Sequence, residues 1–158
     1  SAKRLRMLKL SVAEIIKRIK RGEVFEAFAE DLSFRIKIDD YVPYVCAAIH
    51  NGHQLREELS EICALSDSER LYEEDPYTAD FISSFPIVLD ACDSRYEYDL
   101  NRSPQEAVMK EAWGKQVWNR QLTEEEETRS IAKHDLFYQV MDFIEFTIRL
   151  ELPLQGLY

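Results

Sequence analysis

Apolar residues recur at helical spacing near the start of the chain. Ser11 and Glu14 stand three residues apart, which is the spacing of a capping box at the beginning of a helix. Apolar positions then follow at intervals of one, three and four residues until Gly22, a residue type that commonly ends a helix. These positions are Val12, Ile15, Ile16 and Ile19. The pattern predicts an amphipathic helix between Ser11 and Gly22.

The spacing changes to that of a β-strand in residues 34–50, FRIKIDDYVPYVCAAIH. Apolar side chains first alternate with polar ones, at Phe34, Ile36 and Ile38, which predicts an edge or half-buried strand. After Pro43 the segment is continuously apolar. A continuous apolar run predicts a second strand that is buried on both faces.

Further elements follow along the chain. Residues 85–92, FPIVLDAC, predict another buried strand, which leads into residues 94–102, SRYEYDLNR. Residues 54–65 carry leucine and isoleucine at helical spacing, and a serine followed by proline at 103–104 is typical of a helix start. A glutamate cluster opens a long helix over residues 122–150. Helices that alternate with apolar strands predict an α/β fold, a mixed sheet flanked by helices.

The length and charge of the chain limit its partners. Its 158 residues predict a single domain over residues 1–158, because no repeat or linker divides them. With 30 acidic and 20 basic residues the net charge is −10, which argues against nucleic acid or an anionic membrane as the partner. Basic residues cluster only in residues 3–6 and 17–21, where we expect the solvated face of one helix.

The cysteines point to a reducing compartment. Cys46, Cys63 and Cys92 are odd in number and far apart, which argues against a disulfide framework. No apolar stretch approaches the length of about 20 residues that spans a bilayer. The basic N-terminal segment is not followed by the apolar stretch of a signal peptide. The sequence therefore predicts a cytoplasmic protein.

Two histidines and an acidic loop are candidate metal ligands. His50 ends a predicted strand and His53 follows across an Asn-Gly turn, so both are expected where α/β proteins bind ligands. Imidazole suits zinc, but histidines in a turn also form local hydrogen bonds. Asp75 belongs to an acidic run before Pro76, which is either a source of a carboxylate ligand or a solvated loop.

Two arginines and an asparagine are candidates for binding an anion. Arg95, Asn101 and Arg102 all lie in residues 94–102. A guanidinium offers a planar fork that matches a carboxylate, and a neighbouring amide can bind a second oxygen. The alternative is that both arginines form structural salt bridges with the acidic side chains around them.

The order of these motifs resembles one enzyme family. The His-x-Gly segment at residue 50, EEDPYT at 73–78, SRYEYDLNR at 94–102 and SIAKHDLFY at 130–138 are together similar to the N-formylglutamate amidohydrolase family. SRYEYDLNR is also similar to a segment of aspartoacylases, which are related enzymes of the zinc carboxypeptidase-like fold. The resemblance covers roughly residues 41–146. It implies a zinc carboxypeptidase-like fold and a zinc-dependent amidohydrolase that acts on an N-acyl amino acid, with N-formylglutamate as the leading substrate.

The resemblance also implies roles for single residues. His50 matches the first zinc ligand of the family. Carboxypeptidase-like relatives have a glutamate as second ligand where this chain has His53, so either His53 or Asp75 is implied as the second ligand. Asn101 and Arg102 match the pair that holds the carboxylate of a small-molecule substrate, and Arg95 matches the arginine that polarises the scissile carbonyl.

Two parts of the family site have no match in the sequence. These are a third zinc ligand in an Asp-x-His-Ser-like strand and a glutamate that acts as general base. His134 lies in the segment that matches the late helix, where we expect it to be structural. The resemblance thus implies either an incomplete domain, as part of a longer enzyme, or a form that has lost catalytic parts. A carboxylate- or metal-binding module without turnover and an acidic interaction protein remain the alternatives.

Overall fold

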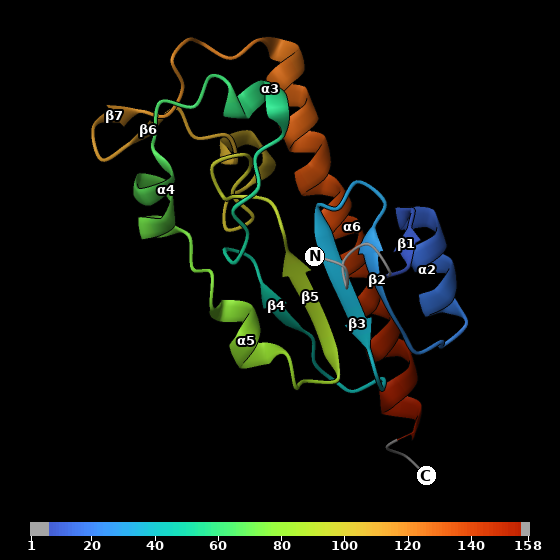
Figure 1. Ribbon diagram of the computed structural model, residues 1–158. Coiled ribbons are helices and arrows are strands. Elements are labelled where there is room, and N and C mark those ends of the chain that lie inside the picture. The colour runs from blue at the N-terminus through green and yellow to red at the C-terminus, as the bar shows by residue number, and fades with distance from the viewer. Residues whose placement is uncertain (1–6, 156–158) are drawn as a thin grey trace.

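A five-stranded mixed sheet lies at the centre of the protein in the computed structural model (Figure 1), which describes residues 7–155. The strand order is β1-β2-β3-β5-β4. The outer pairs β1–β2 and β4–β5 are parallel, and the inner pairs are antiparallel. The strands are β1 Lys9–Leu10, β2 Phe25–Ala29, β3 Phe34–Ile38, β4 Cys46–Ala48 and β5 Ile87–Ala91. The predicted α/β class with a mixed sheet is confirmed.

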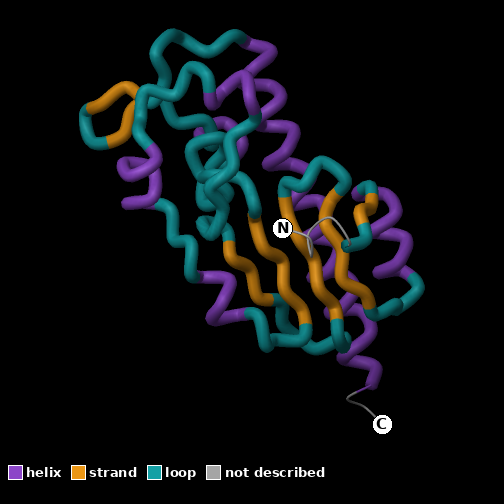
Figure 2. The backbone as a smooth tube through the Cα atoms, in the orientation of Figure 1, coloured by secondary structure: helices purple, strands orange, loops and turns teal. Residues whose placement is uncertain are grey.

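Helices flank this sheet, and a small hairpin lies apart from it (Figure 2). The helical elements are α2 Val12–Lys20, α3 Glu57–Ser60, α4 Asp67–Glu73, α5 Thr78–Ile82, the 3-10 turn η1 Pro104–Glu106 and α6 Glu124–Gln155. The hairpin pairs β6 Glu111–Ala112 with β7 Lys115–Gln116. None of the helices in residues 7–155 combines the length and the apolar character that crossing a bilayer requires.

The two helices with the clearest sequence patterns form one side of the core. Helix α2 begins at the predicted capping box, in which Ser11 and Glu14 exchange hydrogen bonds with each other's backbone N–H groups. Helix α6 packs on the alternating apolar face of β3, and the Phe34 and Phe137 rings meet edge to face at 5.8 Å. Of the basic residues in 17–21, Lys17, Arg18 and Lys20 lie on α2 and Arg21 is its C-cap, whereas residues 3–6 lie outside the described part of the chain.

Of the two strand predictions in residues 34–50, the first is confirmed in its half-buried alternative and the second is wrong. Strand β3 is half-buried as predicted, but it is central because β2 and β5 pair with it on either side. The strand after Pro43 was predicted to be buried on both faces, and this is wrong. Strand β4 has three residues and lies at the edge of the sheet, so Cys46 and Ala47 are only half-buried.

The predicted helix over residues 54–65 is also shorter than expected and is reduced to α3. Its ends bond to distant backbone instead of continuing the helix. Gln54 donates its N–H to Cys92 and accepts from Ser94, and Ala64 donates to Val117. The predicted helix after Ser103 is only the single turn η1. Long-range pairing has overridden the local helical pattern in residues 54–65.

A second apolar cluster lies beyond the end of the sheet and supports the loops there. Its buried members are Leu59, Leu65, Tyr96, Val117, Trp118 and Leu122. Tyr96 belongs to the SRYEYDLNR segment and is 1% exposed. Packing of Tyr96 in this cluster therefore fixes the backbone of the segment and with it the positions of the polar side chains.

Candidate functional site

The loops that follow β4 and β5 lie side by side at one end of the sheet. Because the two strands are parallel neighbours, the residues after each strand meet at the same edge. Gly52 continues this pairing through a bridge to Ser94. A Cβ atom at Gly52 would overlap the backbone of Cys92 and Asp93, so only glycine allows the loops to approach this closely. The approach brings His50 to the SRYEYDLNR segment.

Asp99 is the centre of the resulting side-chain cluster. Its carboxylate is fully buried and accepts a hydrogen bond from His50 Nε2 at 2.8 Å and one from Arg95 Nη2 at 2.9 Å. The backbone N–H of Asn101 donates to it at 2.9 Å, and Arg102 Nε lies 3.5 Å from it. The structural ion pairs that were the alternative for the two arginines are present. They fix the positions of the arginines and leave their other N–H groups for further contacts.

The environment keeps Asp99 ionised and fixes the tautomer of His50. Burial raises the pKa of Asp99, but hydrogen bonds from His50, the Asn101 N–H and Arg95 outweigh burial and hold the pKa well below its usual range. Since a carboxylate only accepts, His50 must donate through Nε2. The other ring nitrogen, Nδ1, then has its lone pair available for a metal ion, as in carboxylate–histidine–metal arrangements.

His53 has a different environment from His50. Its Nδ1 bonds to the buried carboxylate of Glu74, and Arg70 Nη2 donates to its Nε2 at 3.1 Å. Glu74 also accepts from the Ser94 hydroxyl and from Arg70. Both ring nitrogens of His53 are therefore engaged in local hydrogen bonds, and a metal ion could bind only if one of them were released.

Asp75 is hydrogen-bonded to His50 through the backbone. Its N–H donates to the His50 carbonyl oxygen at 2.7 Å, and its side chain is exposed to solvent. Residues 7–155 contain no group of three or more histidine, cysteine, aspartate or glutamate side chains that could hold a metal ion. Asp75 and His50 are thus adjacent in the fold, whereas a complete set of ligands is not assembled among these residues.

The two candidate arginines open onto one small pocket. Its volume is about 210 Å³, and its lining comprises Glu73, Arg95, Tyr96, Arg102, Met109, Glu111, Ala112 and Trp113. Arg95 is mostly buried and donates to the Glu73 carbonyl oxygen at 3.1 Å as well as to Asp99. Arg102 is 48% exposed, and Asn101 beside it is also exposed. The pocket suits a small ligand with a carboxylate that reaches Arg102.

Helix α6 holds the SRYEYDLNR segment from the side. His134, which is 3% exposed, donates from Nε2 to the Arg102 carbonyl oxygen at 2.8 Å, and the Tyr138 hydroxyl donates to the Leu100 carbonyl oxygen. Lys133 donates to Glu97 at 2.7 Å. His134 is part of this scaffold, which agrees with the structural role expected for it.

A buried carboxylate beside this scaffold has a raised pKa. Asp93 accepts from the Tyr98 hydroxyl at 2.7 Å and from Lys133 at 3.1 Å. Burial and the adjacent Glu97 carboxylate raise the pKa of Asp93 to about 6, although Lys133 and Tyr98 oppose this shift. The folded protein therefore takes up a proton at a pH at which the unfolded chain does not.

Proton uptake by Asp93 predicts a pH-dependent contribution to the free energy of unfolding. Because the folded pKa of Asp93 lies above the ordinary value of 3.8, the contribution grows as pH falls through about 6 and is complete below the ordinary value. We expect wild type to gain about 1–2 kcal/mol relative to Asp93→Asn between about pH 7 and pH 4.5. Urea unfolding of both proteins at the two pH values measures the difference. An unchanged difference would show that Asp93 does not bind this proton.

Sequence reasoning missed several residues of the cluster. Asp99 stands inside the SRYEYDLNR motif, whose acidic side chains were considered only as salt-bridge partners of the arginines. Arg70 and Glu74 are four residues apart, a spacing that predicts an ion pair on a helix, so this signal was present. No local sequence pattern identifies Lys133 as part of the cluster, because its two acidic partners lie at least 36 residues away in the sequence.

The chain matches a known protein family over more than half of its length. A model of the N-formylglutamate amidohydrolase family matches residues 42–139, which include both loops, the pocket arginines and the first half of α6. No curated protein and no solved structure gives a significant match to the chain.

Proposed function

The chain belongs to the N-formylglutamate amidohydrolase family, and from this premise we propose that it binds an N-acyl amino acid for zinc-dependent hydrolysis of its amide bond. N-formylglutamate is the reference substrate, because the family acts on it. The observation that carries the proposal is the pocket in which Arg95 and Arg102 are both positioned by the buried carboxylate of Asp99. The zinc carboxypeptidase-like fold is part of the same proposal.

The substrate carboxylate would bind at Asn101 and Arg102. Arg102 is half-exposed, and within the described part of the chain its one ion pair is the long contact to Asp99, so its terminal N–H groups can receive a carboxylate. The Asn101 side chain is exposed beside it and can donate to a second oxygen. Since the overall charge is −10, this local cation is what attracts an anionic ligand.

Arg95 would act on the scissile carbonyl. Asp99 and the Glu73 carbonyl oxygen hold its guanidinium in one orientation at the pocket. A cation that is fixed before the reaction stabilises negative charge on the carbonyl oxygen without a cost of reorganisation. His50 lies on the other side of Asp99, so the same carboxylate positions the residue proposed for the metal and the residue proposed for the oxyanion.

The residues fit a zinc ion in part. The geometry of His50 favours ligation, because Asp99 accepts from Nε2 and leaves Nδ1 free. Asp75 is the better candidate for the second ligand, since its carboxylate is solvent-exposed whereas both nitrogens of His53 are engaged. Zinc bound at His50 would supply a Lewis acid for the amide carbonyl and for a water molecule.

We expect His50→Ala to abolish stoichiometric zinc binding. The reason is that His50 is the one imidazole of the cluster with a free nitrogen beside a buried carboxylate, and zinc binding should also weaken in acid because a ligating imidazole must be neutral. Elemental analysis after dialysis against zinc measures the stoichiometry. His53→Ala is the comparison and is expected to retain zinc. Equal zinc content in wild type and His50→Ala would contradict the assignment.

The carboxylate site is tested by Arg102→Lys. Lysine keeps the charge but lacks the planar fork, so N-formylglutamate should bind roughly ten- to a hundredfold more weakly. Isothermal titration calorimetry gives the affinity of both proteins. Unchanged affinity would reject the role of Arg102.

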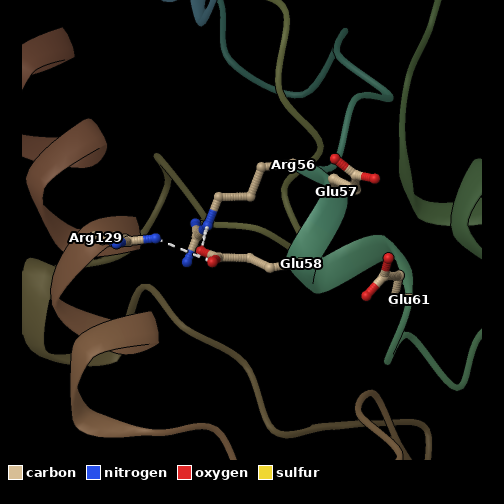
Figure 3. Close-up of a pocket in the computed structure, with 5 residues that line it drawn as sticks. All are labelled: Arg56, Glu57, Glu58, Glu61 and Arg129. Carbon is tan, nitrogen blue, oxygen red and sulfur yellow. Dashed lines mark hydrogen bonds and ion pairs between the residues drawn. The ribbon is translucent and has the colours of Figure 1, made fainter.

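A second hollow on the surface provides the matched control (Figure 3). Its volume is about 410 Å³ and it is lined by Arg56, Glu57, Glu58, Glu61 and Arg129. Arg129 is 56% exposed, close to the exposure of Arg102, but it donates to Glu58 at 3.0 Å and to Glu125 at 2.8 Å. Because its cations are paired with carboxylates, this hollow should not bind the ligand, and Arg129→Lys should leave the affinity unchanged.

The competing function is a carboxylate-binding module without turnover. The observation in its favour is that residues 7–155 do not assemble three metal ligands. Formate release from N-formylglutamate in the presence of zinc distinguishes the two functions. Zinc-dependent release supports the amidohydrolase, and binding without release supports the module.

A further inference from the structure

The β6–β7 hairpin forms a wall of the pocket that holds Arg95 and Arg102. Ala112 and Trp113 line the pocket from the hairpin, and Met109 lines it from the preceding segment. Trp113 and Gly114 form the turn with φ values of 52° and 74°. Two consecutive positive φ values are typical of a tight, two-residue hairpin turn. A positive φ is common for glycine but unfavourable for tryptophan. The turn thus holds a large aromatic side chain at the pocket in a conformation that tryptophan rarely adopts.

Trp113 packs against Tyr72 and remains half-exposed. Its ring meets the ring of Tyr72 on α4 edge to face at 5.7 Å, while 53% of the residue remains exposed. The other tryptophan, Trp118, is 5% exposed and packs in the second apolar cluster. Trp113 therefore has apolar surface available to a ligand in the pocket, whereas Trp118 does not.

The charges of the pocket leave one cation available for a ligand. Arg95 is paired with Asp99 at 2.9 Å, its Nη1 also lies 3.6 Å from the Glu73 carboxylate, and the proposed function assigns it to the scissile carbonyl. Among the described residues, the one ion pair of the Arg102 guanidinium is the contact of 3.5 Å to Asp99. One available guanidinium can hold one carboxylate, and the proposed function assigns it to the carboxylate of the amino acid.

A second carboxylate on the ligand would meet unfavourable surroundings. Glu73 and Glu111 line the same pocket, and apart from the two arginines its other lining residues are Tyr96, Met109, Ala112 and Trp113. A carboxylate placed there would lose hydration without gaining a cation, and it would be repelled by both glutamates. An apolar group of the same length would instead bury its surface against Trp113.

We propose that this pocket selects N-acyl amino acids with an apolar side chain over N-formylglutamate, with Trp113 as the residue that contacts the side chain. The proposal rests on the proposed function, since it takes the α-carboxylate to be bound at Arg102. It differs from that function in the substrate class, because it makes an uncharged, monocarboxylate substrate the preferred one.

Three ligands with side chains of nearly equal length distinguish the effect of a charged side chain from that of an apolar one. N-formylmethionine, N-formylglutamine and N-formylglutamate differ mainly at the end of the side chain, which is apolar, polar and charged, respectively. We expect N-formylmethionine to bind about tenfold or more tightly than N-formylglutamate in calorimetry, with N-formylglutamine between them. Tighter binding of N-formylglutamate would overturn this inference and leave the proposed function intact. Binding of none of the three would overturn both.

Variants of the hairpin test the role of Trp113. Trp113→Ala should weaken N-formylmethionine binding about three- to tenfold and change N-formylglutamate binding less, whereas Trp113→Phe should retain most of the affinity. Tyr77→Ala is the control, because Tyr77 is 68% exposed and does not line the pocket. An equal loss for all three ligands in Trp113→Ala would contradict selection by the side chain.

Fluorescence gives an independent measurement. Only Trp113 of the two tryptophans has substantial exposed surface, so N-formylmethionine should change the emission of wild type and leave that of Trp113→Phe unchanged. An identical ligand-induced change in both proteins would show that the ligand does not contact Trp113.

Discussion

Gly52→Ala is expected to destabilise the folded protein by about 3 kcal/mol or more. The added Cβ would lie within 3.0 Å of backbone atoms of Cys92 and Asp93, and backbone cannot move aside as a flexible side chain can. The loops after β4 and β5 would have to separate. Urea unfolding measures the loss, and the pairing of His50 with Asp99 should be disturbed with it.

Gly22→Ala is the matched control for this substitution. Gly22 has a φ of 66° but no neighbouring atom within 4 Å of an added Cβ, so only backbone strain of about 1–2 kcal/mol is expected. If Gly52→Ala cost no more than Gly22→Ala, the close approach of the two loops would be wrong.

Asp99→Asn is expected to cost about 3–5 kcal/mol of folding free energy, because it removes the anion from a buried set of ion pairs. Asparagine has nearly the same shape, so packing is preserved while His50 and Arg95 lose their charged partner. Urea unfolding at neutral pH gives the value. Asp135→Asn is the control, since the Asp135 side chain is 61% exposed and should change stability by less than about 0.5 kcal/mol.

The outcome for Asp99→Asn bears on the site as well as on stability. If the free energy of unfolding changed no more than in Asp135→Asn, Asp99 would not be the common anchor of His50 and the two arginines. The proposed division of roles around it would then have no structural basis.

Local signals explain which elements could be predicted from the sequence. Helix α2 has a capping box and α6 has a glutamate-rich start, and both patterns lie within the element itself. Strand β3 has the alternation of a half-buried strand. The motif SRYEYDLNR likewise identified three of the pocket and anion-binding residues, because they are close together in the sequence.

The remaining features depend on contacts between distant residues. The bond between His50 and Asp99 spans 49 residues and arises only because β4 and β5 are parallel neighbours. The same pairing draws Gln54 into a bridge and stops the helix that its local sequence favours. The Trp113 turn has a Trp-Gly sequence, which is not a common signal for a tight hairpin.

The binding of an N-acyl amino acid through its α-carboxylate is tested most directly by comparing N-formylglutamate with its α-methyl ester. The ester keeps every other group of the ligand but removes the charge proposed to bind at Arg102. Calorimetry should show that the ester binds at least about tenfold more weakly than the acid to wild type, and that Arg102→Lys reduces this difference. Equal binding of acid and ester, or no binding of the acid, would contradict the account.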